Sequence, residues 1–171
     1  MHLVSSFKQR PNRVLQILLA VSIVGFAHWF FGNLYEAFVL TPNLLGLGAE
    51  GLQLWRQFFK FSDPIYYFLP WNPLSILIVF AALIVGRQSP TKQRKWLIQA
   101  AFFALCTGLL TAYIITQFNL KLYFGPLSQD KVWLESQQRL SALFSLFRLG
   151  CEVATLYFTL RAYLFSLRLS L

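Results

Sequence analysis

The sequence predicts an all-α fold, namely a four-helix antiparallel transmembrane bundle with a short interfacial helix in the first outer loop. Of the 171 residues, 57% are hydrophobic and only 12% are charged, whereas a soluble domain carries about a quarter charged residues. The mean hydropathy of the chain is +0.55. The apolar residues also gather in four long runs separated by shorter polar stretches. The lipid bilayer is therefore the expected environment of this chain.

Four apolar runs are long enough to cross the hydrocarbon core of a bilayer, which takes about 20 helical residues. They cover about residues 14–40, 66–86, 96–118 and 140–165. Pro70 and Pro73 lie near the start of the second run. Because proline removes a backbone donor, the sequence predicts that the regular helix of this span begins at or after Pro73. The four spans together form a single integral membrane domain, residues 1–171.

Charged residues in the loops predict the orientation of the bundle. The termini and the loop on one side carry only basic residues, which are Lys8, Arg10, Arg13, Arg87, Lys92, Arg94, Lys95, Arg161 and Arg168. The other side mixes basic residues with Glu50, Asp63, Asp130 and Glu135. Since cytoplasmic loops are enriched in Lys and Arg, both termini are expected in the cytoplasm. We expect an integral protein of a bacterial inner membrane.

Simple features of the chain argue against a nucleic-acid-binding protein, a cleaved signal peptide and a redox protein. The basic residues that give the net charge of +9 lie at the ends of apolar runs and not on one face, so we expect no nucleic-acid partner. Residues 1–13 resemble the basic lead of a signal peptide, but the run after them is too long and has no clear cleavage site, which predicts a retained first helix. Cys106 and Cys151 lie inside apolar runs without a CxxC motif, which indicates packing residues more than redox thiols.

The first outer loop contains a segment with helical periodicity. In residues 49–61, Leu52, Trp55, Phe58 and Phe59 recur at helical spacing while the polar residues between them face elsewhere. This pattern is typical of a short amphipathic helix that lies on the membrane surface. An aromatic-rich linker is the alternative interpretation.

Polar residues form one stripe along the last span. They are Ser141, Ser145, Arg148, Glu152, Thr155 and Thr159, separated by three or four residues. Such a stripe cannot face lipid, because its groups would be left without hydrogen-bond partners, so we expect it to face the other helices or a cavity. Arg148 and Glu152 are one turn apart and can form an ion pair. Ionisable groups in a span mark a functional or assembly site.

The first span offers a matching polar face. Gly25, His28, Gly32 and Glu36 recur every three or four residues, with Asn33 beside them. If the first and last spans run in opposite directions, a rise of about 1.5 Å per residue brings these residues to the depth of the charged pair. The sequence therefore predicts one shared network of His28, Asn33, Glu36, Arg148 and Glu152.

This network has the groups needed for acid/base chemistry. A histidine beside two carboxylates can exchange protons near neutral pH, and an arginine can hold an anionic or enolate oxygen. The candidate catalytic residues are His28, Glu36, Arg148 and Glu152. The candidate ligand-binding residues are Asn33, Ser145 and Thr155. The alternative is that these residues only join helices by buried hydrogen bonds. One usable histidine and no ExxH repeat fall short of a di-iron bundle, so we predict no metal and no cofactor.

Two classes of function stay open on these observations. The first is a membrane enzyme or binding protein whose lipophilic small molecule enters between the first and last spans. The second is a non-catalytic subunit or scaffold, in which the stripe pairs with another membrane protein or with a second copy of the chain. A transporter is disfavoured, because the sequence contains no internal repeat to support alternating access.

Short motifs in three spans resemble those of a known family. The segments GFAHWFFGNLYEAFVLTPNLL, WNPLSIL and FRLGCE, taken together, are similar to the small four-helix membrane proteins related to anthrone oxygenases. The resemblance covers nearly the whole chain. It implies cofactor-independent oxidation of polycyclic phenolic substrates, with Arg148 matching the arginine of the family's last helix. His28 and Glu36 have no counterpart in that pattern.

Overall fold

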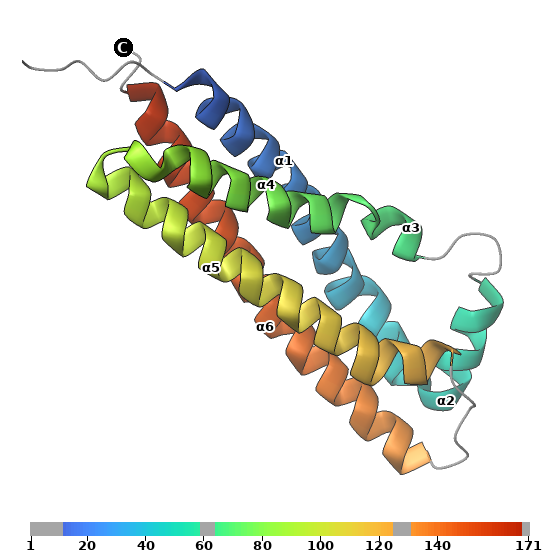
Figure 1. The fold of residues 1–171 in the computed structure, drawn as a ribbon. Helices are drawn as coiled ribbons and strands as arrows, with labels where there is room; N and C mark the ends of the chain where they lie inside the picture. Colours follow the sequence, from blue (N-terminus) through green and yellow to red (C-terminus); the bar gives the residue numbers. More distant parts are fainter. Residues whose placement is uncertain (1–11, 59–63, 125–130, 169–171) are drawn as a thin grey trace, which may run out of the picture.

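A computed structural model describes residues 12–58, 64–124 and 131–168 of the chain, and these residues are almost entirely helical (Figure 1). The six α-helices of the described part are α1 (Arg13–Tyr35), α2 (Thr41–Phe58), α3 (Pro64–Phe68), α4 (Trp71–Val85), α5 (Thr91–Ile114) and α6 (Lys131–Arg168). Three shorter segments follow directly after α1, α4 and α5. They are the π-helical η1 (Glu36–Leu40), the 3-10 helix η2 (Gly86–Gln88) and the π-helical η3 (Ile115–Phe124), in that order. Some residues on which the predictions depend lie outside the described ranges, namely Lys8, Arg10, Phe59, Asp63 and Asp130.

Four helical stretches are long and apolar enough to cross a membrane, as the sequence predicts. They are Arg13–Leu44, Tyr66–Gln88, Thr91–Leu122 and Glu135–Arg168. Each contains the corresponding predicted span, and three of the four extend beyond it at both ends. On length and composition, the chain is therefore a polytopic membrane protein.

The regular helix of the second span begins earlier than the sequence predicts. Helix α4 starts at Trp71 and not at or after Pro73, and its first backbone bond joins the Leu74 N–H to the Pro70 carbonyl at 3.3 Å. Pro73 is the third residue of this helix. The first N–H groups of a helix have no partner in the preceding turn, so a proline there costs no hydrogen bond. The prediction was wrong by two residues because it treated a first-turn proline as an interior one.

The core of the bundle lies between α1, α4, α5 and α6. Helix α1 packs against both α4 and α6, and α5 packs against α4 and α6 (Figure 1). Phe26 and Trp29 of α1 are buried with Val79 of α4 and with alanines of α5. Gly25 permits this packing, because a Cβ atom at that position would collide with the side chain of Ser75 on α4. The first span is thus held on two sides, by α4 and by α6.

The two ends of the bundle are built differently. At the end where α1 begins and α6 finishes, called here the terminal end, Gln16 donates a hydrogen bond of 3.1 Å to the Ser166 carbonyl. At the other end, called here the α2 end, helix α2 packs on α6 and η3 (Figure 1). Leu52 of α2 is fully buried against Phe118 and Leu122. The predicted helix in this loop is therefore present, whereas its position on the membrane surface stays a prediction.

Helix α2 contains a sharp bend at Gly48. This residue has a φ of 57° and a ψ of −127°, which side chains with a Cβ atom rarely adopt. The bend separates the first turns of α2, which continue the line of α1 and η1, from the part that packs against η3 and α6. Glycine at this position therefore allows the chain to turn back over the α2 end of the bundle.

Candidate functional site

A charged cluster joins the first and last spans inside the bundle. The Nη2 atom of Arg148 lies 3.5 Å from Oε2 of Glu36. Its Nε atom lies 3.9 Å from Oε1 of Glu152, one turn further along α6. Glu36 is the residue at which α1 gives way to the π-helical turn η1. One guanidinium is thus in contact with two carboxylates that come from different helices.

Asn33 binds the second carboxylate from the opposite helix. Its Nδ2 atom donates a hydrogen bond of 2.5 Å to Oε1 of Glu152. Asn33 of α1 and Glu36 of η1 are three residues apart in one continuous helical stretch, so both can face α6. We call Asn33, Glu36, Arg148 and Glu152 the polar centre. It contains four of the five residues of the predicted network.

The polar centre is almost fully removed from solvent and lipid. Glu152 is 0% exposed and Arg148 is 5% exposed, whereas 28% of the Glu36 side chain remains exposed. On insertion scales, placing a charged residue at the centre of a span costs about 2.5–3.5 kcal/mol. The charged side chains of the polar centre therefore have to be paired with each other. One guanidinium cannot neutralise two ionised carboxylates. With both carboxylates ionised, the cluster would carry one net negative charge. It can therefore bind one proton, or one hydrogen-bond donor of a ligand, without acquiring a net positive charge.

A small polar chamber adjoins the polar centre on the side of the α2 end. Its volume is about 20 Å³, which is room for about one water molecule. The residues that line it come from η1, α2, α5, η3 and α6, and they are Glu36, Thr41, Leu44, Ile114, Asn119, Leu122, Gln138, Ser141, Ala142 and Ser145. We call this space the polar chamber. It brings Ser145, a predicted ligand-binding residue, to the same cavity as Glu36.

The remaining stripe residues point inward but are bonded within their own helix. The Thr155 hydroxyl donates to the Cys151 carbonyl at 2.9 Å, and the Thr159 hydroxyl donates to the Thr155 carbonyl at 2.7 Å. Both threonines are buried, with exposures of 0% and 2%. The stripe therefore faces the interior, as predicted, but the Thr155 proton is already used by the helix backbone.

His28 lies apart from the polar centre. Its Nε2 atom is 3.1 Å from the Tyr67 carbonyl, and its ring stacks on the Tyr67 ring with 4.1 Å between centroids. The Tyr67 hydroxyl in turn donates to the His28 carbonyl at 3.2 Å. At about 100° per residue, His28 is about 140° around the helix axis from Asn33. It thus faces α3 and α4, and the predicted five-residue network loses its histidine for this geometric reason.

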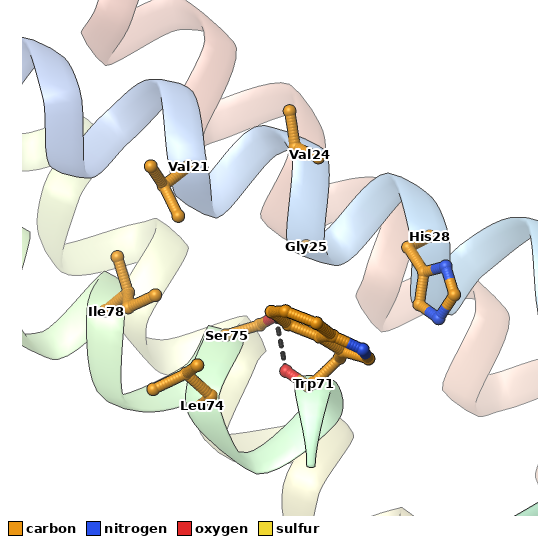
Figure 2. Close-up of a pocket in the computed structure, with 8 residues that line it drawn as sticks. All are labelled: Val21, Val24, Gly25, His28, Trp71, Leu74, Ser75 and Ile78. Carbon is orange, nitrogen blue, oxygen red and sulfur yellow. Dashed lines mark hydrogen bonds between the residues drawn. The ribbon is translucent and has the colours of Figure 1, made fainter. Parts of the chain in front are cut away.

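His28 also lines an apolar groove between α1 and α4, which Figure 2 shows. The groove has a volume of about 240 Å³. Its walls are Val21, Val24, Gly25 and His28 on α1 and Trp71, Leu74, Ser75 and Ile78 on α4. The Ser75 hydroxyl, which lines the groove, donates to the Trp71 carbonyl at 2.7 Å. The groove and the polar centre involve different faces of α1.

Sequence reasoning missed Gln138 and Asn119, which line the polar chamber. Gln138 is only 6% exposed, and neither of its amide atoms has a hydrogen-bond partner among the described residues. It precedes Ser141 by three residues, so extending the stripe by one step toward the start of α6 would have found it. Asn119 gave no such signal, because it lies in the π-helical segment η3, where the periodicity differs from that of an α-helix.

The described ranges contain no group of three or more His, Cys, Asp or Glu side chains arranged to hold a metal ion. Comparison with known protein families, curated proteins and solved structures finds no match to this chain. The fold class and the geometry of the polar centre are therefore the basis on which a function is proposed.

Proposed function

We propose that this chain is a membrane protein that binds a lipophilic small molecule at the polar centre and exchanges a proton with it. The observation that carries this proposal is the Arg148 guanidinium enclosed within one chain between Glu36 and Glu152. Ionisable groups at such a depth are rare in spans and mark substrate or proton sites. Two carboxylates on one guanidinium leave proton-binding capacity that a purely structural ion pair does not need.

The ligand would present a polar head group to the polar centre and leave its apolar body in lipid. The polar chamber has room for about one water-sized group, so a larger body does not fit there. Glu36 keeps 28% of its side chain exposed, and the neighbouring Tyr35 and Phe38 are exposed as well. A molecule in the bilayer can therefore reach the cluster beside Glu36 without crossing the packed core.

Each residue of the polar centre has a role in this proposal. Glu36, the more exposed carboxylate, would accept a proton from a weakly acidic ligand such as a phenol or an enol. Arg148 would hold the oxygen anion that this transfer leaves behind. Glu152 would orient Arg148 through their contact, and Asn33 would hold Glu152 in place by its hydrogen bond. The proton moves from ligand to carboxylate, and no electrons are transferred in this step.

The resemblance to anthrone oxygenase-like proteins agrees with such a ligand, because phenolic substrates are weakly acidic and lipophilic. We propose Arg148 as the residue that would carry that chemistry. The resemblance stays a proposal, and it gives no role to His28, which contacts Tyr67.

We further propose an antiparallel bundle with both termini in the cytoplasm of a bacterial cell and α2 near the outer membrane surface. The contacts of Gln16 with Ser166 and of Asn33 with Glu152 support opposite directions for α1 and α6. The basic residues of the terminal end support its cytoplasmic location. In this orientation the polar chamber opens toward the outer side.

The alternative is a subunit or scaffold that uses the polar stripe to contact a partner chain. This role would be favoured by stripe residues on the outer surface of the bundle. Arg148, Glu152, Thr155 and Thr159 are instead all buried within the chain, with exposures of 5% or less. The first proposal is therefore preferred, and assembly with other chains would have to use different surfaces.

The test is whether a specific lipophilic molecule stays with the purified protein. The chain is extracted in mild detergent, and its organic extract is compared by untargeted mass spectrometry with that of an unrelated four-span protein purified in parallel. We expect at least one weakly acidic compound enriched tenfold or more over bulk lipid. An extract that contains only the lipids of the host membrane, in their usual proportions, would argue against the proposal.

A further inference from the structure

Buried polar groups in the terminal half of the bundle are paired by the protein itself. Gln93 donates to the Ala162 carbonyl at 3.0 Å. Ser22, Thr155 and Thr159 donate to carbonyls one turn earlier in their own helices. Leu15, Leu19 and Leu97 fill the space between them. Among the described residues, no buried side-chain polar atom nearer the terminal end than Glu152 therefore lacks a hydrogen-bond partner.

The half toward the α2 end has the opposite character. Six residues of the spans carry buried polar atoms without a hydrogen-bond partner in the described part of the chain, namely Asn33, Asn72, Thr111, Gln138, Arg148 and Glu152. A buried polar atom that stays unpaired loses the hydrogen bonds it had to water, so each of these atoms favours an additional partner. Glu152 lies near the middle of the membrane domain, and none of the other five lies closer to the terminal end. Among the described residues of the spans, buried polar atoms that need additional hydrogen-bond partners thus lie in the centre and at one end of the membrane domain.

The polar chamber lies where these partners are needed. Gln138, which is 94% buried, lines it with two unpaired amide atoms, and Glu36 connects it to the polar centre. Asn119, Ser141 and Ser145 also line the chamber and are only partly buried. A chamber of about 20 Å³ with several polar partners is of the size and chemistry that holds an ordered water molecule.

We propose that water enters the membrane domain from the α2 end, through the polar chamber, and reaches the polar centre, while the terminal half stays dry. The chamber is then a water-binding site that gives the carboxylates of the polar centre one-sided access to protons. This inference goes beyond the proposed function and does not depend on it, because water can enter whether or not the protein has a lipophilic ligand.

The depth of the residues along α6 provides a sharp control for this proposal. Exposed Arg139 and Arg161 are 22 residues apart, which is about 33 Å of helix and close to the hydrocarbon thickness of about 30 Å. Ser145 is about 9 Å from the level of Arg139, whereas Thr159 is only about 3 Å from the level of Arg161. If the distance from the membrane surface alone determined how easily an aqueous reagent reaches a residue, position 159 would be more accessible than position 145. The proposal predicts the reverse.

The experiment measures how fast a small aqueous cation reaches single cysteines. Cys106 and Cys151 are replaced by alanine, and the variants Ser145→Cys and Thr159→Cys are prepared in lipid nanodiscs. Ag⁺ is used as the probe, since it is close to water in size, needs an aqueous route and binds thiols. The remaining free thiol is alkylated after unfolding in SDS and counted by mass spectrometry. Ser141→Cys, at another position that lines the chamber, replaces Ser145→Cys if that variant does not fold.

We expect Ag⁺ to react at least tenfold faster at position 145, or at 141, than at position 159. Both thiols should react at equal rates once the protein is unfolded in SDS, which controls for intrinsic reactivity. Equal rates in nanodiscs, or faster reaction at position 159, would overturn one-sided water entry. A compound found in the extract described above would not affect this result, so the two proposals can fail separately.

Discussion

At the scale of single residues, Asn33 determines how the buried carboxylate is held. Glu152 is 0% exposed, and its Oε1 atom receives the Asn33 amide at 2.5 Å while the Arg148 Nε lies 3.9 Å away. The shorter of these contacts is the asparagine bond. A hydrogen bond to a charged group is worth about 1.5–3 kcal/mol in soluble proteins, and side-chain bonds within membranes average about 0.6 kcal/mol. We therefore expect Asn33 to stabilise the α1–α6 contact.

Replacing Asn33 by leucine should lower the free energy of unfolding by about 1–2 kcal/mol, because Glu152 loses its hydrogen bond. SDS titration of the protein in micelles, followed by circular dichroism, measures this quantity. The matched control is Asn43→Leu, since Asn43 is exposed and bonds to the Val39 carbonyl in its own segment. Its effect should stay within about 0.5 kcal/mol. Equal effects of the two substitutions would mean that the Asn33 bond does not stabilise the bundle.

At the scale of helices, small residues decide which faces of α1 approach which neighbours. Gly25 accommodates Ser75 of α4, and Gly32 accommodates Tyr67 and Phe68 of α3. These contacts turn the glycine face toward α3 and α4, and they leave the face with Asn33 and Glu36 for α6. The close packing of α1 against α3 and α4 thus helps to turn Asn33 and Glu36 toward α6.

The substitution Gly25→Ala should destabilise the protein by about 1–3 kcal/mol, because its Cβ atom would collide with the Ser75 side chain. Removing the obstacle in the double variant Gly25→Ala, Ser75→Gly should restore part of the loss. Gly150 of α6 is the control, since no atom lies within 4 Å of a Cβ at that position. Gly150→Ala should be neutral or stabilise the helix by up to about 1 kcal/mol. Thermal unfolding in detergent distinguishes the three variants, and no loss at position 25 would contradict close packing of α1 on α4.

The sequence was informative wherever a physical constraint acts locally. Hydrophobic runs predicted all four spans, and the three- and four-residue spacing of the stripe predicted that Arg148, Glu152 and Thr155 face inward. The depth argument also paired Glu36 with Arg148 correctly. The depth argument could not assign His28, because a residue at suitable depth can still point elsewhere, and His28 is about 140° around the helix axis from Asn33. Asn119 was beyond prediction, since a π-helical segment changes the periodicity on which the reasoning depends.

At the scale of the whole molecule, the bundle combines a closed half with a polar half. The terminal half is packed with leucine and alanine, and its polar groups are paired internally. The half toward the α2 end contains the polar chamber and the unpaired groups of Gln138, and the unpaired carboxylate oxygen of Glu152 lies near the middle. Such a division is suited to a site that meets a lipophilic molecule within the membrane and exchanges protons with one side only.

The most direct test of this function is the amount of the co-purified molecule that is bound per chain after Arg148→Leu. Because the guanidinium would hold the ligand's oxygen, we expect at least a tenfold loss relative to the unmodified chain, at equal yield and the same elution volume in gel filtration. Arg139→Leu, which removes an exposed arginine from the same helix, should retain the molecule fully. Retention of the molecule by a folded Arg148→Leu variant, at the level of Arg139→Leu, would contradict a ligand site at the polar centre.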